Sequence, residues 1–151
     1  MCTVFWDRKG VLLVDFLPQG FTINADVYCD ALTKLHHAIQ NKRRGMLSRG
    51  VVLTHDNACP HTAATTQNLI TTFGWEQFDH PPYSPDLAPS DFHLFLHLKS
   101  FLAGRRFQDK VKETVTMCFA SQAASFYDEG IQKLVQRYDK CLNNGGNYVK
   151  K

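Results

Sequence analysis

The first residues of the chain have the pattern of two β-strands joined by a tight turn. Residues 2–6 (CTVFW) and 11–17 (VLLVDFL) are rich in β-branched and aromatic side chains, which are enriched in strands. A short glycine-containing segment, residues 7–10 (DRKG), separates the two runs. We therefore predict an antiparallel hairpin at this end of the chain.

A helix is predicted after the hairpin, because hydrophobic residues recur there at helical spacing. Asn24 precedes them and can cap the helix through its side-chain oxygen. The basic segment 41–45 (NKRRG) marks the expected end of the helix. The residues at helical spacing are Tyr28, Leu32, Leu35 and Ile39.

The middle of the chain alternates predicted strands and helices. Residues 51–56 (VVLTHD) form a short apolar run that predicts a strand buried on both faces. Residues 60–74 predict a helix, with Pro60 near its first turn and Gly74 at its C-terminal end. Another short strand is expected at 75–79 (WEQFD).

A proline-rich segment leads into the helical C-terminal part of the chain. Residues 80–90 hold four of the six prolines, so we predict irregular structure there. A helix is expected over 91–104, and two amphipathic helices follow it. Mixed strands with interleaved helices predict an α/β fold with a layered sheet. The expected apolar faces carry Val111, Val115, Cys118 and Phe119 on one helix and Ile131, Leu134, Val135 and Tyr138 on the other.

Composition narrows the class of protein. The 151 residues are 44% hydrophobic and 21% charged, which is typical of a single globular domain. The net charge of +3 permits a polyanionic partner without requiring one. The five cysteines are scattered and odd in number, which indicates reduced intracellular thiols. No signal peptide and no membrane span are expected.

Two carboxylates lie where metal ligands are often found. Asp56 ends a predicted strand, and Asp91 begins a predicted helix after Pro89 and Ser90. Carboxylates in these settings can converge on Mg²⁺, which prefers oxygen ligands. The competing interpretation is that Asp56 and Asn57 cap the following helix and Asp91 only begins its own, and both interpretations have similar weight on these residues alone. Asp86 is expected to be a turn residue.

Histidines and cysteines invite a zinc interpretation, which the spacing disfavours. Cys59 and His61 are too close together for the usual pairs of structural zinc ligands. His61 can instead approach a phosphate group of a substrate. His93 and His97 are one helical turn apart and are expected to line one partly buried helix face.

Basic residues gather after the first predicted helix. The patch can contact DNA phosphates, which would make binding depend on salt. The alternative is a solvated helix end whose cations complement the helix dipole. Arg105 and Arg106 form a second, smaller group. The main patch consists of Lys42, Arg43, Arg44 and Arg49.

Two linked motifs resemble a known family. The segments 55–63 (HDNACPHTA) and 83–95 (YSPDLAPSDFHLF) resemble the catalytic region of mariner-type transposases of the Tc1/mariner superfamily, and 34 residues separate Asp56 from Asp91 as in that family. The resemblance extends over nearly the whole chain. It implies the ribonuclease-H-like fold of the retroviral integrase superfamily.

The resemblance also implies specific roles. Asp56 and Asp91 match the second and third of the family's three metal-binding aspartates, which hold Mg²⁺ or Mn²⁺ and cut and join transposon-end DNA. Asp7 matches a turn residue. The first aspartate, its strand and the helix-turn-helix modules lie upstream in the family. Residues 1–151 are therefore expected to be a single partial catalytic domain, lacking its first strand and inactive or nearly inactive alone.

Other consequences follow from the same resemblance. The basic patch, with Lys42, Arg43, Arg44 and Arg49, becomes a candidate for DNA contact, together with His61. A nuclear location and a possible homodimer are also implied. The alternative function is a non-catalytic DNA-binding or protein-interaction module derived from a transposase, or a piece of a SET-domain–mariner fusion.

Overall fold

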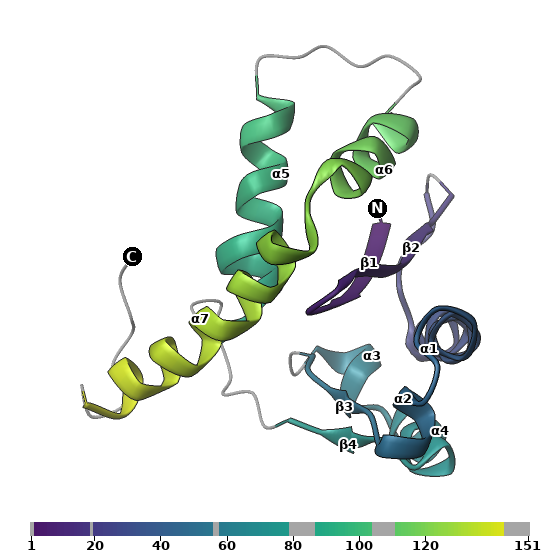
Figure 1. Cartoon of the computed structure of the whole chain (residues 1–151). Coiled ribbons are helices and arrows are strands. Elements are labelled where there is room, and N and C mark those ends of the chain that lie inside the picture. The colour runs from purple at the N-terminus through teal and green to yellow at the C-terminus, as the bar shows by residue number, and fades with distance from the viewer. Residues whose placement is uncertain (1, 19, 56–57, 79–86, 104–110, 144–151) are drawn as a thin grey trace. The chain divides into compact units, whose positions relative to one another are not determined.

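The structure is a computed structural model that divides into two compact units (Figure 1). The first unit comprises Met1–Phe5 and Leu12–Pro82, and the second comprises Trp6–Val11 and Tyr83–Lys151. The residues that the structure describes are 2–18, 20–55, 58–78, 87–103 and 111–143.

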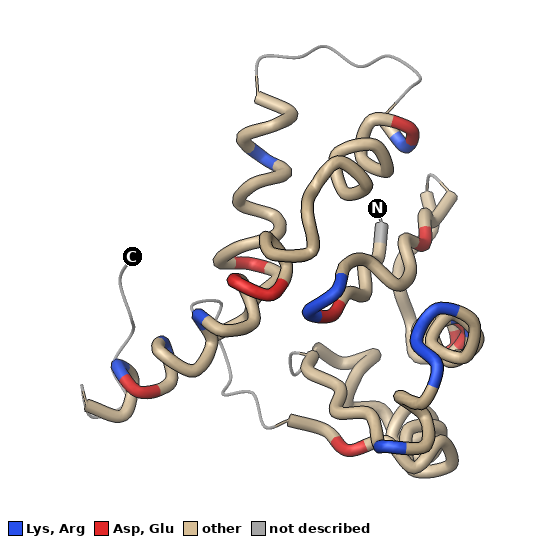
Figure 2. The backbone as a smooth tube through the Cα atoms, in the orientation of Figure 1, with Lys and Arg blue, Asp and Glu red and all other residues tan. Residues whose placement is uncertain are grey.

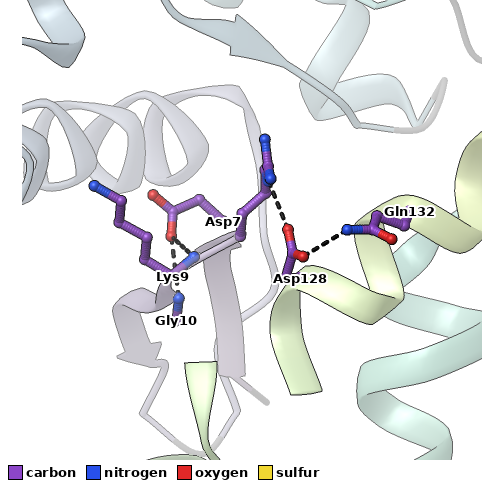
Figure 3. Close-up of polar contacts among 6 residues, drawn as sticks. Asp7, Lys9, Gly10, Asp128 and Gln132 are labelled. Atoms are coloured by element: carbon purple, nitrogen blue, oxygen red, sulfur yellow. Dashed lines mark hydrogen bonds and ion pairs between the residues drawn. The ribbon is translucent and has the colours of Figure 1, made fainter. Parts of the chain in front are cut away.

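The predicted hairpin is present. Strands β1 (Cys2–Asp7) and β2 (Gly10–Phe16) form a two-stranded sheet. The short connection between them makes the pair antiparallel, because parallel strands need a long crossover. A carboxylate oxygen of Asp7 accepts hydrogen bonds from the backbone amides of Lys9 and Gly10, at 2.9 and 3.1 Å (Figure 3). The prediction that Asp7 is a turn residue is therefore confirmed.

Helix α1 (Ala25–Lys42) also follows the prediction. The side chain of Asn24 accepts a hydrogen bond from the backbone amide of Val27 at 2.9 Å, which satisfies one amide that the helix itself leaves unpaired. A short helix, α2 (Met46–Arg49), follows α1. The buried face of α1 is formed by Tyr28, Ala31, Leu32, Leu35 and Ile39.

Strands β3 (Val52–Leu53) and β4 (Glu76–Gln77) pair in parallel, with Val52 opposite Glu76. The predicted burial of β3 on both faces is wrong. Leu53 is buried, whereas the Val52 side chain is 59% exposed. Neighbouring side chains of a strand point to opposite faces, and the core of the first unit covers only the face that carries Leu53.

The helix predicted between these strands is interrupted. It consists of α3 (Cys59–Thr62) and α4 (Ala64–Phe73), separated at Ala63, whose backbone is extended. At this point two side chains take backbone carbonyls that would otherwise accept helical hydrogen bonds. The Thr66 hydroxyl bonds the Pro60 carbonyl at 2.5 Å, and the amide of Gln67 bonds the carbonyl of His61 at 2.8 Å. Gly74 ends α4 in the left-handed conformation that the prediction required (φ 72°).

One hydrophobic core holds the first unit together. The apolar face of α1 packs against residues from β2, β3 and α4. Trp75 is buried in this core and packs against Phe73, with their ring centroids 4.9 Å apart. The remaining buried members are Leu12, Val51, Leu53 and Ile70.

The second unit is mainly helical. A single turn of π-helix, η2 (Ser90–Leu94), leads into α5 (Phe95–Leu102). The amphipathic helices α6 (Val111–Ser121) and α7 (Ala124–Asn143) follow. Most of the proline-rich segment and the predicted helix end at Gly104 lie outside the described residues.

The apolar faces predicted for α6 and α7 are only partly right. Val115, Cys118 and Phe119 are buried as expected. Val111 and Val135 are exposed, and Val135 has 65% of its surface accessible. The buried face of α7 carries Tyr127 and Gly130 instead. Tyr127 lies against residues 6–10, called the hairpin tip below, and Gly130 lies against His93 of η2.

Candidate active site

Asp91 lies in the first turn of η2, at the position predicted from sequence. Its side chain is exposed, whereas the next residues, Phe92 and His93, are buried. The backbone amides of Asp91 and Phe92 both donate to the carbonyl of Ala88, at 2.9 and 3.0 Å. A negative charge in the first turn of a helix is favoured by the helix dipole. The chain therefore presents one hard oxygen ligand to solvent at this point.

The residues on either side of Asp91 are held by side-chain contacts. The indole N–H of Trp6 donates to the hydroxyl of Ser90 at 3.0 Å. Nε2 of His93 donates to the backbone carbonyl of Phe126 at 2.7 Å, because a carbonyl can only accept. Sequence patterns did not predict Trp6 as a neighbour of this turn. No local signal exists for it, since 84 residues separate Trp6 from Ser90.

Asp56 and Asn57 lie outside the described residues, so the distance between Asp56 and Asp91 stays a prediction. The residue before Asp56 is described. Nδ1 of His55 and the hydroxyl of Tyr28 are hydrogen-bonded at 2.8 Å, and Nε2 of His55 lies 2.9 Å from Oε1 of Gln77. Residues from α1 and β4 therefore hold the imidazole of His55, the residue directly before Asp56 in the sequence.

His61 joins the same group of side chains. Its ring stacks on the ring of His55 with centroids 4.8 Å apart and an interplanar angle of 4°. The centroids of the Tyr28 and His61 rings are 4.2 Å apart. His61 is half-buried, and nothing in these contacts tests its predicted approach to phosphate.

The zinc interpretation gains no support from the described part of the chain. Within it, no group of three or more histidine, cysteine, aspartate or glutamate side chains could hold a metal ion. Both ring nitrogens of His55 are engaged by hydrogen bonds. The carboxylate of Asp91 fits the oxygen chemistry of Mg²⁺ or Mn²⁺, and its expected partner Asp56 is not described.

His93 and His97 line a helix face, as predicted. Both rings contact Phe126, with centroid distances of 4.3 and 5.0 Å. Nε2 of His97 also lies 2.9 Å from the side-chain amide of Gln122. These histidines are therefore packed against α7 and the residues that precede it.

Basic residues gather at the C-terminal end of α1 and in α2, as Figure 2 shows in blue. The ammonium group of Lys42 donates to the carbonyl of Leu12 at 3.0 Å, and the guanidinium of Arg43 donates to the carbonyl of Lys42 at 3.2 Å. Arg44 and Arg49 are exposed. The patch therefore combines hydrogen bonds around a helix end with cations that face solvent. Arg105 and Arg106 lie outside the described residues.

None of the helices in the described ranges is both long and apolar enough to cross a membrane.

Comparison with known proteins identifies the family. Residues 1–49 match the family described as "Transposase (partial DDE domain)". The chain is 40% identical to the mariner Mos1 transposase of Drosophila mauritiana over 99% of its own length and 44% of that protein. It is 36% identical to the histone-lysine N-methyltransferase SETMAR of Homo sapiens over 98% of its length and 22% of that protein. The chain thus spans less than half of either relative.

A solved structure gives the same answer for the fold. The structure of the Mos1 transposase catalytic domain with raltegravir and Mn matches with a TM-score of 0.94 at 40% identity. The match covers 97% of this chain and 76% of that one. The predicted ribonuclease-H-like fold is therefore confirmed. The chain belongs to the mariner-type transposases and corresponds to part of their catalytic domain.

Proposed function

We propose that this chain is part of the catalytic domain of a mariner-type DNA transposase, in which Asp56 and Asp91 hold divalent metal ions. Its substrate is transposon-end DNA, and the reaction is cleavage and joining of phosphodiester bonds. The likeness to the Mos1 catalytic domain carries the proposal, because that domain is described with Mn and with Mg. Mos1 transposase is also described in a paired-end complex with the left transposon end.

The chain contributes ligands rather than a complete site in this proposal. Asp91 presents its carboxylate from the first turn of η2, and Asp56 follows the held residue His55. When bound, Mg²⁺ or Mn²⁺ activates the attacking oxygen and stabilises charge on the phosphate and leaving oxygens. Because the family uses a third aspartate, we expect little cleavage from the 151-residue chain by itself. A nuclear location and a homodimer are part of the same proposal.

The test is a nicking assay on DNA that carries a mariner transposon end, with Mg²⁺ or Mn²⁺ added. It compares the 151-residue chain, an N-terminally extended version that supplies the third aspartate, and the extended version with Asp91→Ala. Asp139→Ala is the matched control, since Asp139 is another exposed aspartate in a helix. Cleavage by the extended version should be lost with Asp91→Ala and kept with Asp139→Ala. Equal activity of these two variants would refute the role of Asp91.

A second candidate function is DNA binding without catalysis. The cations at the end of α1 and in α2 favour it, because Arg44 and Arg49 are both exposed. Replacing Lys42, Arg43, Arg44 and Arg49 by alanine should weaken binding to duplex DNA and reduce the salt slope by roughly 0.9 per lost phosphate contact. An unchanged affinity and slope would mean that the patch is ordinary solvated surface.

A further inference from the structure

The turn that carries Asp91 has an unusual combination of exposure and anchoring. Asp91 is exposed, but Phe92 and His93, the two residues after it, are each only 9% exposed. Ser90, directly before it, is bonded to Trp6. An exposed carboxylate is therefore flanked on both sides by side chains with fixed partners.

Three contacts account for this anchoring. The Ser90 hydroxyl accepts the Trp6 indole N–H at 3.0 Å, and His93 bonds the Phe126 carbonyl at 2.7 Å. The ring of Phe92 lies under the guanidinium of Arg137, whose central carbon is 4.3 Å from the ring centroid. One partner, Trp6, lies at the hairpin tip, and the other two, Phe126 and Arg137, lie in α7. Each contact bridges segments that are distant in sequence.

The two supporting segments are also tied to each other. The ring of Trp6 lies 6.4 Å from that of His93 and 5.8 Å from that of Tyr127, measured between centroids. The guanidinium of Arg8 pairs with Asp128 at 2.6 Å, and Asp128 also accepts from Gln132 (Figure 3). Because the Arg8 pair is largely exposed, it contributes little stability by itself. The pair joins the hairpin tip to the first turn of α7.

Gly130 makes the close approach of α7 possible. A Cβ atom at this position would lie 2.3 Å from Cδ2 of His93 and 2.8 Å from Cγ. Only glycine leaves room for the imidazole there. The His93 ring is therefore placed by its contact with Trp6, its hydrogen bond to Phe126 and the space above Gly130.

From these contacts we infer that Ser90 and His93 are positioning residues for Asp91, held by Trp6 and Phe126, while Gly130 leaves room for the His93 ring. This inference rests on the proposed function and adds which side chains hold the turn that carries Asp91. Residues that orient a metal ligand from behind commonly change metal affinity by 10–100-fold when they are removed. Neither Ser90 nor His93 needs to touch the metal ion or DNA for this effect.

The test uses the ¹⁵N-labelled 151-residue chain and the variants Ser90→Ala and Ser100→Ala. Ser100 is an exposed serine in α5, so it controls for the chemistry of the substitution. Hydrogen exchange is measured at the Asp91 and Phe92 amides, which both bond Ala88. Ser90→Ala should speed their exchange by about fivefold, the effect of losing one ordinary hydrogen bond, while amides of α7 keep their rates. Equal exchange in the two variants would overturn the inference.

Titration with Mn²⁺ supplies the second readout, through broadening of the Asp91 and Phe92 amide signals. Ser90→Ala should raise the Mn²⁺ concentration at half-broadening on the order of tenfold, and Ser100→Ala should leave it unchanged. Identical midpoints in both variants would contradict a positioning role. No broadening in either the unaltered chain or the N-terminally extended version would refute Asp91 as a ligand, and with it the proposed function, while the exchange rates would still decide whether Ser90 holds the turn.

Trp6→Phe tests the hydrogen bond from the other side, since it removes the indole N–H and keeps an aromatic ring. If the bond to Ser90 transmits the effect, Trp6→Phe should speed exchange at Asp91 less in the Ser90→Ala background than in the unaltered chain. Additive effects of the two substitutions would show that Trp6 and Ser90 act independently, which would overturn the coupling.

Discussion

Substitution of Gly130 by alanine tests the close contact between α7 and His93. In an open helix position this change stabilises a protein by about 1 kcal/mol, because alanine is the better helix former. Here the new Cβ would lie 2.3 Å from Cδ2 of His93 and 3.0 Å from its Nε2. The imidazole cannot turn away freely, since its Nε2 bonds the Phe126 carbonyl and its ring stacks on Phe126.

The size of the effect follows from these opposing contributions. Overpacking a core position costs about 1–3 kcal/mol. Displacing the ring also breaks a hydrogen bond of a buried group, which costs a further ~1 kcal/mol or more. The two losses exceed the helix-propensity gain. We therefore expect Gly130→Ala to lower the free energy of unfolding by roughly 2 kcal/mol.

The assay is urea unfolding followed by ¹⁹F NMR of 5-fluorotryptophan, because the two tryptophans, Trp6 and Trp75, belong to different units. The Trp6 signal reports the second unit. The matched control is the same substitution in a His93→Ala background, where the clashing ring is absent. There Gly130→Ala should become stabilising by about 1 kcal/mol. The same destabilisation in both backgrounds would refute the clash with His93.

Further predictions concern the helix cap, the core and the response to pH. Asn24→Ala should lower the stability of the first unit by about 1 kcal/mol in urea unfolding, and Asn24→Asp should largely retain it, because Asp also caps. Leu32→Ala should cost about 2–5 kcal/mol, because Leu32 is fully buried in the core, and a loss below 1 kcal/mol would mean that the core is not well packed there. Burial, reinforced by the nearby Cys118, raises the pKa of the Tyr127 hydroxyl above its ordinary value of 10.0. The stability that the buried Tyr127 hydroxyl contributes is therefore fully present below pH 10.0 and is lost as the pH rises through its folded-state pKa. Tyr127→Phe should flatten the fall in the free energy of unfolding above pH 10.0. An equally steep fall in this variant would contradict the assignment to Tyr127.

Local sequence determined much of the secondary structure. The hairpin, the Asn24 cap and the buried face of α1 all follow from spacing and from the chemistry of single residues. The left-handed end of α4 at Gly74 follows for the same reason. The helical start at Asp91 was also predictable, since proline and serine precede it. Each of these features depends on residues within a few positions of one another.

Tertiary contacts decided the rest. The break at Ala63 depends on the side chains of Thr66 and Gln67 taking backbone carbonyls, which hydrophobic periodicity does not reveal. Val135 has the spacing of a core residue, but the neighbours that α7 meets select the face with Tyr127 and Gly130 instead. Periodicity shows that a helix has an apolar stripe, and it does not show which part of the stripe finds a partner.

The candidate site shows the same division. The sequence by itself indicated Asp91 and its helical setting, because a carboxylate at a helix start is a local feature. The support of that turn by Trp6 and by the Phe126 carbonyl came only from the tertiary structure. Hydrogen bonds between segments 84 and 33 residues apart depend on how strands and helices pack in three dimensions, and no short stretch of sequence encodes that packing.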